Sequence, residues 1–168
     1  MIEALKTLNR LKRAGVIKDY VIGGGYAVNY YLEPILTYDL DIYVLMTTDK
    51  EYTALYQYFR SHKYGIKNVY IVIEGMPVQF LPSFISPLVD EAIRRAKRIR
   101  VKGTTSKVLT VEYLIATLLM AFRPKDKMVI PHLLEQADMQ VLSEILGRFG
   151  DEKAPLDNRL GRILESLQ

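Results

Sequence analysis

An alternating segment, TYDLDIYVLM at residues 37–46, places the first limit on how this chain folds. Asp39 and Asp41 alternate there with apolar residues, and only a β-strand sends successive side chains to opposite faces. One face of the strand is therefore apolar and buried, while the other carries both carboxyl groups, with their β-carbons roughly 7 Å apart. Two carboxylates beside each other on a half-buried strand repel each other and are costly to desolvate.

Two interpretations of this acidic pair are open. A divalent cation held between Asp39 and Asp41 would remove the penalty, whereas a polar, solvent-facing strand edge would avoid it. The chain contains no Cys and only two His, so disulfides, thiolate metal sites and a His-rich zinc site are excluded. A bound metal must therefore have oxygen ligands, which favours Mg²⁺ or Mn²⁺.

A glycine-rich bend, IGGG at residues 22–25, precedes the acidic strand. It follows a short apolar strand at 20–22 and leads into a helix that Pro34 closes. Glycine lets the backbone approach a ligand closely, and the free N–H groups of the helix that follows can bind a phosphate. The bend is neither a dinucleotide fingerprint, because Val28 replaces the third glycine, nor a Walker loop. A plain tight turn is the alternative.

Helical and strand patterns alternate along the first two thirds of the chain, and helical patterns continue from Thr110 to the end. A β-hairpin is expected at 69–82 with Gly75-Met76 as its turn. This order predicts a mixed α/β (α+β) fold, in which helices flank a mixed sheet and a helical C-terminal part follows. The expected division is a core at 1–109 and a helical region at 110–168 that packs on it.

The charge is mildly basic, with a formal net charge of +4 and a pI of about 9.2, which suits a phosphate-bearing partner. RRAKRIRVK at 94–102 either binds nucleic-acid phosphates or forms a solvated helix face and edge strand. No apolar run reaches the roughly 20 residues that a membrane span needs. The N-terminus reads as an amphipathic helix without a signal peptide. These features predict a cytoplasmic protein without a membrane partner.

Taken together, Ile22-Gly23-Gly24 and Asp39-Leu40-Asp41 resemble the signature of the nucleotidyltransferase superfamily, which has the DNA polymerase beta type fold. With Thr37 two residues before Asp39, the chain is similar to the small prokaryotic members, including the abortive-infection toxin type. PVQFLP at 77–82 resembles their later strand, and the helix that ends in Arg123, Lys125 and Asp126 resembles their Arg-x-Lys-Asp segment. The resemblance extends over about residues 15–135.

The resemblance implies a metal-dependent enzyme with a toxin-like role, which moves a nucleoside monophosphate from a nucleoside triphosphate to a hydroxyl group of an RNA, a protein or a small molecule. Asp39 and Asp41 would be catalytic and would hold two Mg²⁺ ions together with the triphosphate. The implied nucleotide-binding residues are Gly23, Gly24, Tyr26, Thr37, Arg123, Lys125 and Asp126. The alternative role for Tyr26 is packing at the edge of the core. The alternative role for Lys125-Asp126 is to begin a helix.

Gln79 stands where the family usually carries a third carboxylate, and it is neutral. With Gly75-Met76 as the turn, Glu74 would lie on the same face as Gln79 and could supply the missing charge as a metal ligand. Leu118 and Ile35-Leu36 also depart from the family, in which some relatives carry Lys and Arg. The alternative function is therefore a catalytically impaired nucleotide-binding module, such as a toxin–antitoxin or regulatory component. The sequence does not determine the oligomeric state.

Overall fold

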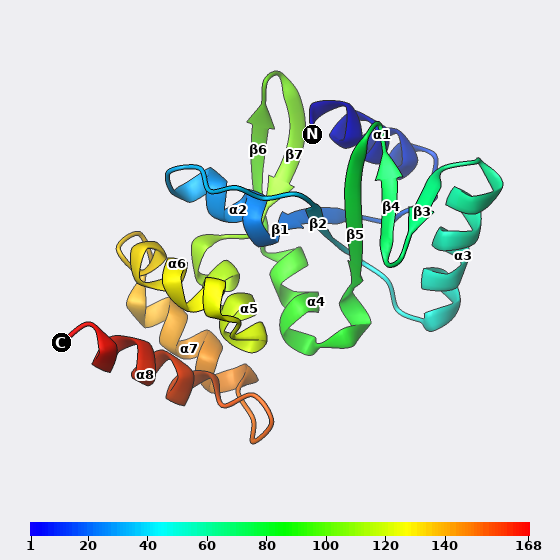
Figure 1. Cartoon of the computed structure of the whole chain (residues 1–168). Helices are drawn as coiled ribbons and strands as arrows, with labels where there is room; N and C mark the ends of the chain where they lie inside the picture. The colour runs from blue at the N-terminus through cyan, green and yellow to red at the C-terminus, as the bar shows by residue number, and fades with distance from the viewer.

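A seven-stranded mixed sheet lies at the centre of the structure, a computed structural model that describes residues 1–168 (Figure 1). The strands follow the order β3-β4-β5-β2-β1-β7-β6 across the sheet. Their bounds are β1 Tyr20–Gly23, β2 Leu40–Val44, β3 Gly65–Lys67, β4 Tyr70–Ile73, β5 Met76–Pro82, β6 Lys97–Val101 and β7 Thr104–Val108.

The helices surround this sheet and form the whole C-terminal third of the chain. None of them is long and apolar enough to cross a lipid bilayer. The mixed α/β fold predicted from the sequence is confirmed. The helical bounds are α1 Ile2–Arg13, α2 Gly24–Tyr31, α3 Asp49–Ser61, α4 Pro87–Arg94, α5 Val111–Ala121, α6 Pro124–Leu134, α7 Met139–Phe149 and α8 Leu156–Ser166, with a short 3₁₀ turn at Ser83–Ile85.

The pairing of three central strands positions the candidate site. β1 runs antiparallel to β2, with Gly23 opposite Asp41. β2 runs parallel to β5, with Asp41 beside Gln79. Paired residues point to the same face of a sheet, so the glycine bend, the acidic strand and the position of the expected third carboxylate lie side by side.

Two layers of helices cover the sheet. On one face, Asn9 of α1 accepts a hydrogen bond from the Tyr20 hydroxyl of β1, and Phe59 of α3 stacks on Phe80 of β5 with ring centroids 5.5 Å apart. α4 and α5 lie against the other face (Figure 1). The apolar side chains of α1 recur every third residue and are buried there, as an amphipathic helix requires.

α5 is apolar around most of its circumference and almost completely buried, which is typical of a helix with partners on every side. α6, α7 and α8 pack against it. The Arg159 guanidinium of α8 donates hydrogen bonds of 2.8 Å to the carbonyl oxygens of Leu119 and Met120, so it satisfies acceptors that the end of a helix leaves unpaired. Phe122 then reverses the chain in a left-handed conformation, with φ of 51°.

The turn of the β4–β5 hairpin lies one residue earlier than predicted. Glu74 and Gly75 form the turn, with φ of 51° and 79°, and Ile73 pairs with Met76. A two-residue hairpin turn with both central residues at positive φ matches the twist of the strands and prefers Gly at its second position. The predicted turn, Gly75-Met76, would have placed a bulky Met in that conformation. Sequence analysis also missed the short, largely exposed β3.

Candidate active site

The glycine bend lies directly on the side chains of β2. A β-carbon added to Gly24 would lie 2.0 Å from Asp41 Oδ2, and one added to Gly23 would lie 2.2 Å from Cε2 of the Tyr43 ring. Gly24 also has φ of 56°, in the left-handed region that favours glycine. These residues are glycines because the backbone touches the acidic strand, so the bend does more than reverse the chain.

The third glycine of the bend meets the segment that leads into β2. A β-carbon on Gly25 would lie 2.6 Å from Thr37 Oγ1, whose hydroxyl donates a hydrogen bond to the carbonyl oxygen of Asp39. The segment is also held by Asn29, whose side-chain amide hydrogen-bonds to both the N–H and the carbonyl of Ile35. The start of α2 and the residues before the acidic pair therefore form one packed unit.

The acidic pair lies on one face, as the alternation predicts. Asp39 immediately precedes β2, and both carboxylates are partly buried. Burial, followed by the charge and contact of Asp39, raises the pKa of Asp41 to about 7, and the positive charges of Arg123 and Lys125 oppose this shift. A cation beside a carboxyl group in this setting stabilises its charged form.

A cavity of about 50 Å³ is lined by Gly25 and Thr37, while Asp39 and Asp41 are not among its lining residues. Leu118, on α5, also lines it, at the position where some relatives carry Lys. The polar and glycine residues of the lining are Gly25, Thr37, Arg123, Lys125 and Asp126. The structure thus brings together most of the residues that the resemblance implies for nucleotide binding.

Asp126 has a structural role in this group. Its side chain is only 3% exposed, and it accepts hydrogen bonds of 2.9 Å from both the backbone N–H and the Nε of Arg123. It therefore caps the start of α6 and fixes the guanidinium at the edge of the cavity. Lys125 is exposed and has no ion-pair partner. Helix initiation, one of the two roles considered for Lys125-Asp126, accounts for Asp126.

We expect Asp126→Ala to lower the free energy of unfolding by about 2 kcal/mol, because a helix cap and a buried charged partner of Arg123 are both lost. Lys125→Ala should leave stability within about 0.5 kcal/mol, since it removes only an exposed side chain. Urea unfolding of the two variants measures the difference. Equal stability of both would show that the Asp126 contacts do not hold the start of α6.

Two of the residues implied for the site lie elsewhere. The Tyr26 hydroxyl contacts Met76 Sδ at 4.0 Å, and its ring lines an apolar cavity with Ile22 and Val108, on the face opposite Asp41. Packing, the alternative role for Tyr26, describes this position. Glu74 is exposed in the hairpin turn, because the turn is one residue earlier than predicted, so it lies outside β4 and does not pair with Pro77 as that prediction required.

Tyr43 is a residue of this face to which sequence analysis gave no role. Its position two residues after Asp41 indicated the shared face, but nothing in the sequence indicated that Gly23 would pack on its ring. Burial and the nearby Asp41 charge raise the pKa of Tyr43 to about 12, against a hydrogen bond with Thr117 of α5. Tyr43 therefore stays neutral and joins the bend, the acidic strand and α5.

The donor set suits a hard divalent cation. Asp39 and Asp41 supply carboxylate oxygens, and the amide of Gln79 stands beside Asp41 in the sheet. No group of three or more Asp, Glu or His side chains in the structure is placed to hold a metal ion, so Asp39 and Asp41 are the two anionic ligands available here. Mg²⁺ fits such a set, since it is commonly bound through one or two carboxylates and completed by water and substrate phosphates.

Comparisons with known proteins support the fold. No protein-family model and no curated protein matches the sequence. Among solved structures, an antigenic nucleotidyltransferase-like protein from Paracoccidioides brasiliensis matches with a TM-score of 0.60 at 12% identity, over 98% of this chain and 88% of the other. The solution structure of the antibiotic-resistance factor ANT(2'')-Ia matches with a TM-score of 0.55 at 12% identity, over 98% of this chain and 95% of the other. Its complex with adenylyl-2''-tobramycin matches with a TM-score of 0.52 at 12% identity, over 93% and 98%. The chain therefore has the nucleotidyltransferase fold.

Proposed function

We propose that this protein is a metal-dependent nucleotidyltransferase, which moves a nucleoside monophosphate from a nucleoside triphosphate to a hydroxyl acceptor. The observation that supports this most directly is the seating of the Asp41 carboxylate against Gly24, beside Asp39. A plain turn or a solvated strand edge does not require a glycine to touch a partly buried carboxylate. The fold of the neighbours agrees with this function.

Each part of the site has a distinct task in this proposal. The backbone N–H groups at the start of α2 hydrogen-bond to the phosphates, since the first N–H groups of a helix have no partner within the helix. Arg123 and Lys125 neutralise further phosphate charge from the rim of the cavity. Asp39 and Asp41 would hold Mg²⁺ or Mn²⁺, with Gln79 as a neutral third ligand. Bound metal supplies activation of the attacking hydroxyl and stabilisation of the pyrophosphate leaving group.

The acceptor is open among RNA, protein and small molecules. The complex of ANT(2'')-Ia with adenylyl-2''-tobramycin favours testing aminoglycosides, and the sequence resemblance to abortive-infection toxins favours testing RNA. We propose the toxin-like role on that resemblance alone.

The test is incubation of the protein with each labelled nucleoside triphosphate and Mn²⁺, together with tRNA, a protein extract or aminoglycosides. We expect label to enter one acceptor class and chelation of the metal to stop it. A lack of transfer across all nucleotides and acceptors would contradict the proposal.

Gln79 supports a second candidate, a module that binds nucleotide without turnover. The residue lies beside Asp41 where a third carboxylate is expected, and Glu74 is not there to replace it. Calorimetry separates the two candidates. Nucleotide binding that needs no divalent ion and is unchanged in Asp39→Ala favours the module, whereas binding that requires both the metal and Asp39 favours the enzyme.

A further inference from the structure

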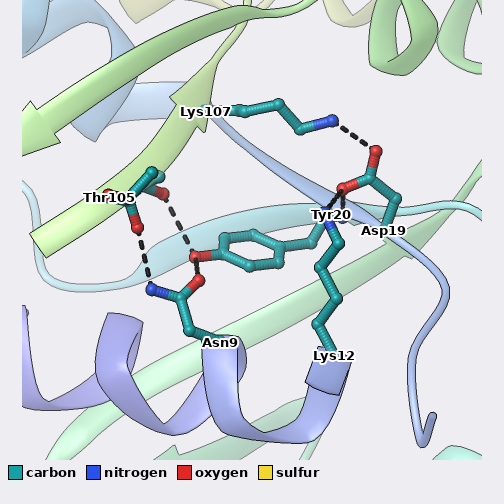
Figure 2. Close-up of polar contacts among 7 residues, drawn as sticks. Asn9, Lys12, Asp19, Tyr20, Thr105 and Lys107 are labelled. Atoms are coloured by element: carbon teal, nitrogen blue, oxygen red, sulfur yellow. Dashed lines mark hydrogen bonds and ion pairs between the residues drawn. The ribbon is translucent and has the colours of Figure 1, made fainter.

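A polar cavity of about 180 Å³ lies at the end of β1 opposite the glycine bend, between α1 and the β6–β7 hairpin (Figure 2). Its floor is a fixed network. The Tyr20 hydroxyl donates to Asn9 Oδ1 at 2.6 Å and lies 3.2 Å from Ser106 Oγ, while Asn9 Nδ2 donates to the carbonyl oxygen of Thr105 at 2.8 Å. These neutral groups satisfy one another, so the charged side chains determine what the cavity attracts.

Three cations and one carboxylate line this cavity, which gives it a net charge of +2. Lys12 and Lys107 both contact Asp19. Burial raises the pKa of the Asp19 carboxyl group, but the hydrogen bonds from Lys107 and Lys12 lower it more. The pKa of Asp19 is therefore lowered, and the carboxylate stays charged. One carboxylate therefore serves two lysines, and the third cation, Arg98, is left over.

Arg98 is an exposed residue of the edge strand β6 and is the one cation of the cavity without a protein partner. It makes no ion pair and no side-chain hydrogen bond, although it lines the cavity. It also lies directly opposite Lys107 in the antiparallel β6–β7 pair. Like charges in opposite positions of a sheet destabilise it. A bound anion would remove this repulsion and give the guanidinium a partner.

We propose that this cavity binds a phosphoryl dianion through Arg98, Lys107 and Lys12. The net charge of the cavity matches that of the ligand, and guanidinium and ammonium groups are the common phosphate donors in proteins. The cavity is below the roughly 300 Å³ of a pocket for a drug-sized ligand, so it suits a phosphate or the phosphate end of a larger molecule. Tyr20 and Gly23 are separated by about 10 Å of strand, so the site is separate from the acidic pair and independent of nucleotidyl transfer.

The experiment is a titration of the full-length protein with inorganic phosphate, and separately with 5′-AMP, in EDTA, followed by calorimetry and by backbone amide chemical shifts. Shifts at Asp19, Tyr20 and Lys107 report this cavity, and shifts at Gly24 and Gly25 report the candidate active site. Arg98→Ala should weaken binding about tenfold or more, because one charge-assisted hydrogen bond is lost. Arg13→Ala is the charge-matched control, since Arg13 is exposed on α1 outside the cavity.

Binding of phosphate alone at the cavity amides identifies a free-anion site, and binding of 5′-AMP alone identifies a site for a phosphomonoester. Either result supports the proposal if it depends on Arg98 and not on Arg13. Shifts confined to Gly24 and Gly25, or equal affinity in wild type and Arg98→Ala, would overturn it. Arg98 has no folded-state partner and lies opposite Lys107, so the thermal midpoint of the variant should equal or slightly exceed that of the wild type.

Discussion

Asp41→Asn is expected to abolish nucleotidyl transfer and, at pH 8, to make the protein more stable. The folded-state pKa of Asp41 is raised to about 7, first by burial and then by Asp39, above the unfolded value near 3.9. A group with a raised folded-state pKa binds more protons in the folded state, so its contribution to stability is lost as pH rises through that range. Asn has the same shape without the charge and therefore avoids this loss.

We expect a gain of at least about 1 kcal/mol at pH 8, or roughly 2–4 °C in the thermal midpoint, and no gain at pH 4, where the carboxyl group is protonated in the folded protein. Transfer should fall at least about a thousandfold, because a metal ion contributes several kcal/mol of transition-state stabilisation. Thermal unfolding at the two pH values and the labelled-nucleotide assay measure these effects.

Asp19→Asn provides a control of opposite sign. The pKa of Asp19 is lowered in the folded state by Lys107 and Lys12, against burial, so the charged carboxylate stabilises the fold at pH 8 and its removal should lower the midpoint. A lower midpoint for Asp41→Asn at pH 8 would show that the carboxylate is not under electrostatic strain. Transfer at the wild-type rate would remove Asp41 from the catalytic site.

Gly24→Ala is expected to reduce transfer about a hundredfold, since misplacement of a reacting group by about 1 Å has an effect of this size. The new methyl group would lie 2.0 Å from Asp41 Oδ2, so the carboxylate or the bend must move. The left-handed conformation of Gly24, with φ of 56°, adds a backbone penalty for Ala. Together these effects should lower the free energy of unfolding by at least about 2 kcal/mol.

Gly15→Ala is the matched control for this prediction. Gly15 also has positive φ, at 79°, but an added β-carbon would meet no atom within 4 Å. The Gly15→Ala variant should therefore lose only about 1 kcal/mol of the free energy of unfolding, from the unfavourable backbone conformation of Ala. It should retain wild-type transfer. Measurement of urea unfolding and transfer rate for both variants separates conformation from contact. Equal losses in the two variants would mean that the contact of Gly24 with Asp41 does not matter.

The acidic strand and the bend could be predicted from the sequence because local rules determine both. Period-two alternation places Asp39 and Asp41 on one face without reference to the rest of the chain. A glycine run between an apolar strand and a helix predicts a sharp bend. The same local reasoning predicts the start of α3 from Thr48 or Asp49 as the N-cap, and in the structure the Thr48 side chain accepts a hydrogen bond from the N–H of Glu51.

Features that depend on distant partners could not be predicted in the same way. The neighbours of β2 are β1, which precedes it, and β5, which comes more than thirty residues later, and tertiary packing determines that order. The position of Glu74 depended on a one-residue choice of hairpin turn, because the earlier turn removes Glu74 from the strand and leaves Ile73 as the last paired residue of β4. The location of Tyr26 depended on which face of the sheet the Tyr26 side chain of α2 packs against. The helical pattern alone does not determine that face.

The burial of α5 limits how the protein can rearrange when a ligand binds. This helix begins next to β1, where the Leu109 N–H donates to the carbonyl oxygen of Ile22, and it is also the axis around which α6–α8 pack. Hinge opening between sheet and helices would expose an apolar surface on both sides. Adjustment to a ligand is therefore left to residues 33–38, which carry the exposed Leu36 and Tyr38 beside the acidic pair.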